Sequence, residues 1–472
     1  MIEIRAAILF LILLVSCQSP NVKINAEHPN IILIMADDLG WGDVGFNGNS
    51  VIKTPALDEL AGKGIIFSRF YAAAPVCSPT RGSCLTGRHP FRYGIITANA
   101  GKMKREEVTL AEFLKQKGYA TGHFGKWHLG TLTNDIIDAN RGGRDSNVYS
   151  PPWENGFDVC FSTESKVPTW DPMITPGLDA GDIGNRITGM PFGTYYWTGP
   201  GEMVNENLEG DDSRVIMDRV IPFIENQSEN KKSFFAVVWF HTPHLPVLTG
   251  ERYRNLYPEL SLDEQHFYGA ISAMDEQVGR LTATLNDLGI AENTLLFFAS
   301  DNGPEGIERG GRTQGSTSGF RGRKRSLYEG GVRVPGFVVW PAGIKPGQKT
   351  AFPLVTSDYF PNILEILEEK NQFPVTPVDG ISMIPVWNGT LQDRSAPIGF
   401  QHSENKALTG NRYKLVQIGD KFELYDLISD PFETNNLSSI LPDILEQMKK
   451  ELNQFVVSCD HSKNGGDYRS PD

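Results

Sequence analysis

The sequence of 472 residues contains only five cysteines and more acidic than basic side chains. It also has no apolar run of the ~20 residues that a membrane span needs. The cysteines form no CxxC pair and no metal-type spacing, which excludes a disulfide framework and a cysteine-rich metal centre. A net charge of -13 argues against general nucleic-acid binding, because proteins of that class present a basic face. Any binding of an anion must therefore depend on a local cluster of cations.

The rest of the composition is that of a large globular protein. Hydrophobic residues make up 40% of the chain and aromatic residues 10%, which is enough for a large core and a second, smaller one.

The first 17 residues have the pattern of a bacterial secretion signal. Arg5 precedes the apolar run 6–15, and the segment ends in Leu14-Val15-Ser16-Cys17, as in lipoprotein signals whose cysteine is lipidated. An ordinary signal peptide that contains a cysteine is the alternative, and a transmembrane anchor is less favoured because the run is short. We predict a lipoprotein-type signal over residues 1–17 with lipidation at Cys17, and a polar leader over residues 18–28. Export to the periplasm or cell surface follows, with membrane contact only through the lipid anchor.

Short apolar runs of buried-strand type alternate with helical segments through most of the chain. This alternation is typical of the α/β class, with a large, mostly parallel sheet sandwiched between helices. We expect such a sheet in a catalytic domain over residues 29–390. Its predicted strands are 30–36, 65–71, 119–124, 234–240, 294–300 and 336–340, and predicted helices begin at Thr54-Pro55 and at the capping box Thr109–Glu112 and include Ile271–Leu285.

Polar side chains follow four of these strands directly. Because ligands of open α/β sheets bind at the carboxyl ends of the strands, one sheet edge is expected to gather all of them. Two adjacent carboxylates favour a hard-metal site, with turn-making and capping as the alternative. Two histidines that flank a proline favour catalysis over a structural role. The four pairs are Asp37/Asp38, Lys126/His128, His241/His244 and Asp301/Asn302.

The segment Cys77-Ser78-Pro79-Thr80-Arg81 reads as a helix start. Ser78 is a good N-cap, Pro79 suits the first helical position, and Gly87 is a plausible end. The free amides and positive dipole end would then face Cys77 and favour an anion there. A buried cysteine in a short turn is the alternative.

The two remaining parts of the chain differ from this pattern. Residues 131–207 are rich in Gly, Pro, Asp and Trp with weak periodicity, which predicts long loops that shape specificity. Residues 391–472 predict a small α+β subdomain. There, strands 413–418 and 422–427 flank Gly419-Asp420 as an antiparallel hairpin, and Leu445, Met448, Leu452 and Phe455 lie on one face of a closing helix.

An ordered set of motifs identifies the family that the chain resembles. In chain order they are IILIMADDLGWGD, CSPTRGSCLTGRHP, GKWHLG, HTPHLP, SDNGP, GRKRSLYEGGVRVP and ELYDLISDPFETNNL. The set resembles the formylglycine-dependent sulfatases of the alkaline phosphatase superfamily along nearly the whole mature chain. An alkaline phosphatase-like fold and hydrolysis of sulfate esters are what this resemblance implies.

The resemblance also implies the site residues. Cys77 would be oxidised by a formylglycine-generating maturation enzyme, and the hydrated formylglycine would supply the nucleophilic hydroxyl. A divalent cation, calcium, would be held by residue 77 with Asp37, Asp38, Asp301 and Asn302, all oxygen donors of the kind that a hard cation selects.

The remaining catalytic roles are implied in the same way. Arg81 would fix the hydrate and Lys126 the sulfate, and His128 would take the proton when the sulfated intermediate collapses. His244 and Lys324 would bind the sulfate and support the departing oxygen. A sulfate ester is a stable monoanion, so attack on it needs cations that neutralise its charge and fix its geometry. Cys84 is expected to be a small buried side chain, because alanine is common at that position in the family.

The substrate is expected to be a sulfated carbohydrate, attacked in exo fashion because of the long loops. Aromatic side chains in those loops could stack on sugar rings or simply pack in the loops. Arginines beside Lys324 could meet further anions or form a solvated run, and His241 could contact substrate or be structural. The residues concerned are Trp153, Trp170, Tyr195, Tyr196 and Trp197 among the aromatics, and Arg321, Arg323 and Arg325 among the arginines.

Two other functions remain open on the sequence. One is hydrolysis of a phosphodiester or phosphonate monoester, since some relatives in the superfamily share a formylglycine. The other is a non-catalytic surface lipoprotein that binds sulfated glycans, in which Cys77 would stay unmodified.

Overall fold

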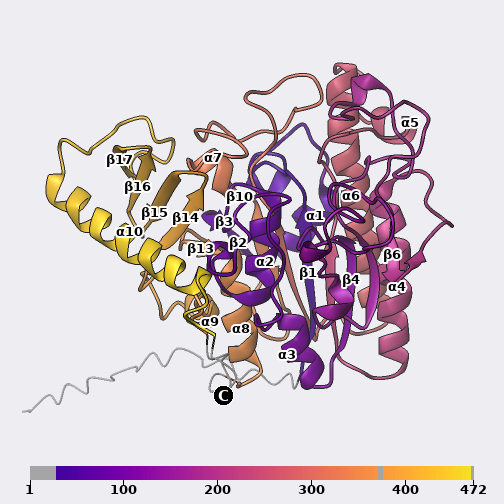
Figure 1. Ribbon diagram of the computed structural model, residues 1–472, viewed down its shortest axis with the longest axis horizontal. Helices are drawn as coiled ribbons and strands as arrows, with labels where there is room; N and C mark the ends of the chain where they lie inside the picture. The colour runs from indigo at the N-terminus through magenta and orange to yellow at the C-terminus, as the bar shows by residue number, and fades with distance from the viewer. Residues whose placement is uncertain (1–27, 370–375, 469–472) are drawn as a thin grey trace, which may run out of the picture.

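The computed structural model describes residues 28–369 and 376–468, and its centre is a ten-stranded sheet (Figure 1). Four parallel strands form the middle of this sheet: β9 (Thr294–Ser300), β1 (Asn30–Ala36), β8 (Phe234–Trp239) and β4 (Ala120–Lys126). The full strand order is β12-β2-β11-β9-β1-β8-β4-β5-β6-β7. The predicted α/β class with a mixed, mostly parallel sheet is confirmed.

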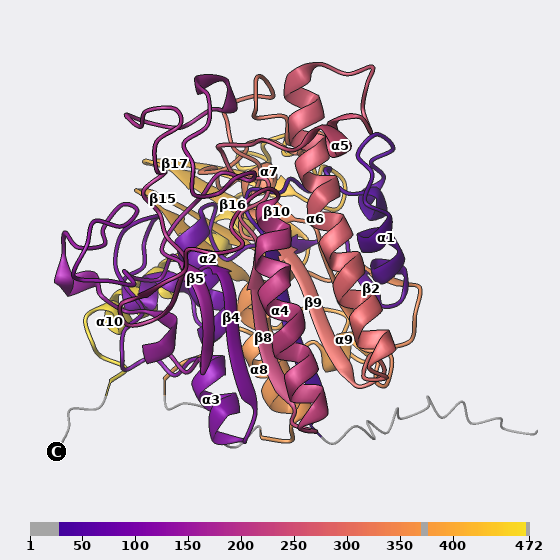
Figure 2. The ribbon, with the colours of Figure 1, turned by 90° about the vertical axis from the view of Figure 1, so that its right-hand side faces the viewer.

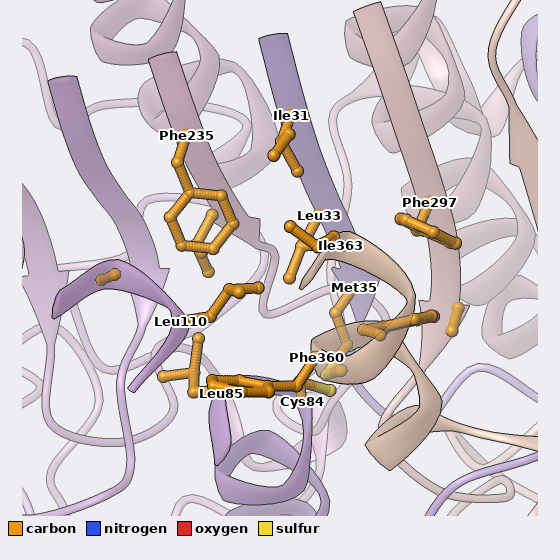
Figure 3. Packing of buried hydrophobic residues seen from close by; sticks show 14 of the residues in the cluster. Ile31, Leu33, Met35, Cys84, Leu85, Leu110, Phe235, Phe297, Phe360 and Ile363 are labelled. Carbon is orange, nitrogen blue, oxygen red and sulfur yellow. The ribbon is translucent and has the colours of Figure 1, made fainter. Parts of the chain in front are cut away.

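Strand β1 shows why several central strands have continuous apolar sequences. Ile31, Leu33 and Met35 point to one face, where Phe360 and Ile363 of helix α8 (Tyr359–Ile366) cover them (Figure 3). The alternate side chains Ile32, Ile34 and Ala36 point to the other face, under helices α1 (Pro55–Gly62), α4 (Asp212–Glu229) and α6 (Leu262–Asp287) (Figure 2). Both faces are buried, so both sets of side chains must be apolar.

Two helices complete the first face. Helix α2 (Cys77–Thr86) contributes Cys84 and Leu85 to the core, and helix α3 (Leu110–Gln116) contributes Leu110 (Figure 3). The predicted capping box is present, because Thr109 and Glu112 accept hydrogen bonds from each other's backbone amides.

The region predicted as long loops also contains regular structure. Strand β5 (Val159–Thr163) extends the parallel sheet beside β4, and the short strands β6 (Trp197–Gly199) and β7 (Glu202–Met203) follow in antiparallel pairing. The predicted strand 65–71 is divided into β2 (Ile65–Phe67) and β3 (Phe70–Tyr71). A three-stranded sheet is formed by β3 with β10 (Arg333–Val334) and β13 (Leu354–Val355).

The C-terminal part is a four-stranded antiparallel sheet with a long helix packed on it, as predicted. Its strands are β14 (Ile398–His402), β15 (Asn405–Thr409), β16 (Tyr413–Ile418) and β17 (Lys421–Asp426), and the helix is α10 (Pro442–Lys463) (Figure 1). Leu408, Leu415 and Leu424 pack against Met448 and Leu452 of α10. On its other face, Phe400 and Val416 of this sheet pack in one cluster with Tyr71 and Val355 of the larger part of the protein.

Within residues 28–369 and 376–468, none of the helices has the length and apolar character of a membrane span. The predicted signal 1–17 with Cys17, and all of the polar leader except His28, lie outside the described residues. The short elements are β11 (Gly336–Val339), β12 (Gln348–Thr350), α5 (Glu251–Arg254), α7 (Glu329–Val332), α9 (Ile384–Trp387), and the 3-10 helices Gly45–Asn47, Pro90–Tyr93, Ser146–Val148, Pro152–Glu154, Leu178–Ala180 and Thr356–Asp358.

Candidate active site

The carboxyl ends of the central strands deliver buried polar residues to one edge of the sheet. Asp37 and Asp38 follow β1, Lys126 ends β4, and Asp301 follows β9. Backbone hydrogen bonds between neighbouring strand ends fix the positions of two of these residues. The Asp37 amide donates to the Thr242 carbonyl at 3.0 Å, and the Asp301 amide donates to the Ala36 carbonyl at 3.1 Å. Each of the four side chains is at most 1% exposed. The predicted gathering at one edge is present, below the loops that cluster over the sheet (Figure 2).

Three cations and three carboxylates pair within this edge. Lys126 Nζ lies 2.7 Å from Asp37 Oδ2, Arg81 Nη2 lies 2.6 Å from Asp301 Oδ2, and Lys324 Nζ lies 2.6 Å from Asp38 Oδ1. Burial acts to raise the pKa of Asp37, but the surrounding cations, Lys126 foremost, hold that pKa well below its ordinary value. Burial and the charge of Asp37 raise the pKa of Asp301 to about 7. The cluster is therefore a closely balanced set of buried charges.

Two buried oxygen atoms of this edge are free for a cation. Asp37 Oδ1 and Asn302 Oδ1 are buried and have no hydrogen-bond partner among the described residues. One potential metal-ligand atom from each of Asp37, Asp38 and His244 lies within 4.8 Å of the other two. Asn302 adjoins this group because its Nδ2 donates to Asp38 Oδ1 at 2.6 Å. Unpartnered buried carboxylate and amide oxygens fit a hard divalent cation, whereas the His244 imidazole borders this group without offering an oxygen.

Cys77 lies at the first turn of α2, but the helix begins differently from the prediction. The N-cap is Val76 in extended conformation, and Cys77 is already helical. Ser78 therefore stands inside the helix and does not cap it, and its hydroxyl has no partner in the part of the chain that the structure describes. Gly87 ends the helix with φ 68°, as predicted. The consequence is that the unpaired first-turn amides start at Cys77 itself.

The Cys77 thiol lies near cations that could bind an anion, but the thiol itself is unreactive. Its side chain is 2% exposed, and burial raises its pKa against the opposing charges of Lys126 and Lys324. A thiol with a raised pKa stays protonated at neutral pH and is a poor nucleophile. The nearby cations are paired with Asp37, Asp38 and Asp301, so an anion bound beside residue 77 would share them with these carboxylates.

His128 is held by a residue that the sequence did not point to. Its Nε2 lies 2.7 Å from Asn99 Oδ1, and the same oxygen accepts a hydrogen bond from Asn140 at 2.9 Å. Burial, with the charge of Lys126, keeps the pKa of His128 well below its ordinary value. The neutral ring therefore donates from Nε2 to Asn99 and presents an unprotonated Nδ1, which has no partner among the described residues.

The two histidines of the HTPHLP segment have different roles. His244 Nδ1 donates to the Leu245 carbonyl at 2.6 Å, and its Nε2 lies 3.6 Å from Asp38 Oδ2, inside the site. His241 is fully buried, with Nδ1 at 2.8 Å from Asp212 and Nε2 at 2.8 Å from Thr163. Both ring nitrogens of His241 are occupied, so its geometry corrects the substrate-contact prediction in favour of the structural alternative.

Of the cationic residues 321–325, Lys324 alone enters the carboxylate cluster. Arg323 donates to the backbone carbonyls of Glu305, Gly306 and Gly315 and so holds the loop. Arg321 lies over the Tyr328 ring at 3.7 Å. Arg325 is at the rim, with a side chain 57% exposed and 2.6 Å from Glu305. Glu305 also lies 3.3 Å from Lys324, and it was missed because only the folded loop brings it there.

The predicted sugar-stacking aromatics separate into two groups. Tyr196 and Trp197 are buried, the first stacked on Phe161 at 4.1 Å and the second donating to Asp138 at 2.8 Å, so their role is packing. The other three side chains are partly exposed in the loops: Trp153, Trp170 and Tyr195.

Comparison with known proteins gives consistent matches. The family model described as sulfatase matches residues 29–369, and the model described as N-sulphoglucosamine sulphohydrolase, C-terminal, matches residues 320–458. The N-acetylgalactosamine-6-sulfatase of Mus musculus is 30% identical over 405 residues, covering 82% of this chain and 72% of that protein. The steryl-sulfatase of Mus musculus is 31% identical over 420 residues, covering 77% of this chain and 66% of that protein. The crystal structure of Ps i-CgsB in complex with k-i-k-neocarrahexaose has a TM-score of 0.77 and 25% identity, covering 93% of this chain and 94% of that chain.

Proposed function

The chain belongs to the sulfatase family and is a sulfuric ester hydrolase, and from that premise we propose that it removes sulfate from carbohydrates with formylglycine at position 77 and calcium at the carboxylate cluster. The observation that carries this proposal is the set of three buried cations, Arg81, Lys126 and Lys324, around the first turn of α2. With calcium bound, the site has a net positive charge that suits a sulfate monoanion.

Each polar group of the site has a place in the reaction. A hydrated formylglycine at position 77 would supply a nucleophilic hydroxyl, which the protonated Cys77 thiol does not offer. Arg81, fixed by Asp301, orients this hydrate, and Lys126 binds a sulfate oxygen. His244 and Lys324 hold the sulfate and neutralise charge on the departing oxygen. His128 would accept a proton from residue 77, and its unprotonated Nδ1 without a partner among the described residues is the observation that supports this role.

The calcium proposal rests on the oxygen donors of the cluster. Asp37, Asp38, Asp301 and Asn302 would hold the ion together with residue 77, and the unpartnered oxygens of Asp37 and Asn302 are the observation that supports this. Calcium would supply a Lewis acid that polarises the oxygens around position 77.

A carbohydrate substrate is proposed from two of the relatives. One is named as a sulfatase of N-acetylgalactosamine, and Ps i-CgsB is described with a neocarrahexaose. Steryl-sulfatase shows that the family also includes enzymes of other substrates. The loops gathered over the site favour exo action (Figure 2). Removal of sulfate from only the internal residues of an intact polymer would contradict exo action.

The function is tested by a substrate panel with enzyme whose conversion at position 77 is verified by mass spectrometry of the Cys77 peptide. We expect sulfate release from at least one defined sulfated mono- or oligosaccharide, and turnover of an aryl sulfate above that of matched phosphodiester and phosphonate monoester substrates. A preference for a phosphorus ester by orders of magnitude would assign the protein to the other hydrolase class. If the unmodified protein binds sulfated glycans and the converted protein turns over no substrate, the protein is a non-catalytic glycan-binding protein.

Asn99 provides a prediction about pH. Asn99 is exposed, so the overall fold should persist after substitution, although its φ of 61° means that Asn99→Ala costs about 1 kcal/mol of stability. Asn99→Ala should lower kcat about tenfold, because it frees the His128 ring, and general base catalysis contributes ~10²–10⁴-fold. Asn99→Asp places a negative charge at Nε2 and raises the pKa of His128, so the acid limb of the kcat–pH profile should move to higher pH. A fall in kcat for Asn99→Asp without movement of this limb would show that Asn99 does not act through His128.

We also propose that the protein is exported and anchored to the membrane through lipid on Cys17. The support is the sequence pattern of residues 1–17. Metabolic labelling with a palmitate analogue tests it, since Cys17→Ser should abolish labelling.

A further inference from the structure

The ELYDLISDPFETNNL segment has no role in the reaction described above, yet it contacts the loop that carries Lys324. This loop, residues 320–329, leads into α7, which is located beside the C-terminal sheet (Figures 1 and 2). The contacts come from two adjacent residues of the segment, Phe432 and Glu433, and from strands β16 and β17.

Glu433 holds the end of the loop. Its Oε2 accepts the backbone amide of Glu329 at 2.6 Å, and its Oε1 pairs with Lys414 of β16 at 3.0 Å. Lys414 in turn lies 2.8 Å from Glu329 Oε1. All three side chains are at most 1% exposed, so the end of the loop is fixed by a buried charge network that spans both parts of the protein.

Phe432 and strand β17 hold the beginning of the loop. The Phe432 ring stacks on Phe320 with centroids 5.6 Å apart. Arg321 donates to the Tyr425 hydroxyl at 2.7 Å and to the Glu433 carbonyl at 3.3 Å. Both ends of the loop are therefore attached to the C-terminal subdomain.

Lys324 lies between these two attachments. Its amide donates to the Pro304 carbonyl at 3.0 Å, and the next amide, of Arg325, donates to the Pro75 carbonyl at 2.8 Å, two residues before Cys77. The loop is thus held from the C-terminal side at its ends and from the catalytic side at its middle.

We infer that Phe432 and Glu433 are positioning residues for Lys324, so that the C-terminal subdomain sets the place of a cation in the active site. The inference rests on the proposed function, in which Lys324 meets the sulfate. Displacement of a reacting group by ~1 Å can cost ~10²-fold in rate. Loss of one attachment, with the others intact, should therefore cost about tenfold.

The test uses two single substitutions in the full chain, and a thermal melt separates loss of the fold from loss of turnover. Phe432 is 45% exposed, so Phe432→Ala should leave the protein folded. Glu433→Gln keeps an acceptor for the Glu329 amide but loses the charge that faces Lys414. Arg412→Ala is the matched control, because Arg412 forms an ion pair with Asp426 in the same sheet with its own side chain 61% exposed. Turnover of 4-nitrophenyl sulfate is measured for each variant, normalised to converted residue 77 and accompanied by a thermal melt.

We expect kcat to fall about tenfold in Phe432→Ala and Glu433→Gln and to be unchanged in Arg412→Ala. In a Lys324→Ala background, the same two substitutions should lower kcat by less than about twofold, because the group that they position is gone. Wild-type kcat in both single variants, or an undiminished tenfold loss in the Lys324→Ala background, would overturn the inference. Wild-type kcat in Lys324→Ala alone would instead refute the proposed role of Lys324, and the inference with it.

Discussion

Cys77→Ala is expected to abolish sulfate release from every substrate that the converted wild-type enzyme accepts. Loss of an enzymatic nucleophile costs on the order of 10⁵–10⁶-fold in kcat, and alanine cannot be oxidised to formylglycine. The fold should persist, because Cys77 is a free cysteine in a helix that alanine favours. Relative to the unconverted protein, which keeps the Cys77 thiol, we expect a stability loss of only about 1 kcal/mol from the removed sulfur. The measurements are sulfate release and thermal unfolding of the two proteins.

Cys84→Ala is the matched control for this experiment. Cys84 is in the same helix, fully buried in the core beside Leu85 and Phe360 (Figure 3). Removal of its sulfur should lower the stability by a similar amount and leave turnover intact, because the side chain packs in the hydrophobic core. Sulfate release by Cys77→Ala at a substantial fraction of the wild-type rate would mean that the nucleophile is elsewhere.

The residues at strand ends could be predicted because the rule that places them is local. Strands β1, β8 and β9 are almost continuous apolar runs, and β4 is identified by its place between a capped helix and the Gly125-Lys126 pair, so the polar residues at the strand ends mark the active edge. Asp37, Lys126 and Asp301 were found in this way, and the structure places them within one charge cluster. Arg81 and Lys324 follow no strand end, and only the motif resemblance pointed to them.

Elements that depend on distant partners were missed. Strand β5 lies in a Gly- and Pro-rich region and forms by pairing Phe161 with Phe124 of β4, a contact that no local pattern shows. Helix α4 was also missed, because it contains Pro222, and a proline in a sequence by itself indicates the end of a helix.

Residues that act by position alone were missed for the same reason. Asn99 is an exposed loop residue with φ 61°, and nothing in its neighbours connects it to His128. The attachment of the Lys324 loop to Glu433 likewise joins residues about a hundred positions apart. Spacing in sequence carries no signal for such contacts.

Removal of calcium is expected to abolish turnover reversibly and to lower the unfolding temperature. Asp37, Asp38 and Asp301 are buried together, and with their three cations paired, two oxygens remain without a partner among the described residues. An ion present at 100 times its Kd stabilises the folded state by about 2.7 kcal/mol, which the chelator EGTA would remove. The measurements are sulfate release and thermal unfolding before EGTA, after it, and after calcium is restored.

The identity of the ion and the place of the site are tested separately. Magnesium should restore less activity than calcium, because it prefers a near-ideal octahedron with several retained waters over a buried set of protein oxygens. Asn302→Ala removes one unpartnered oxygen and should raise the calcium concentration needed for half-restoration by about tenfold or more, which corresponds to ~1.4 kcal/mol. Full turnover and an unchanged unfolding temperature after exhaustive chelation would exclude the ion. If Asn302→Ala keeps the wild-type calcium dependence, the ion is not bound by the Asn302 oxygen. The chelation experiment therefore tests whether the ion is present, and the variant tests where it is bound.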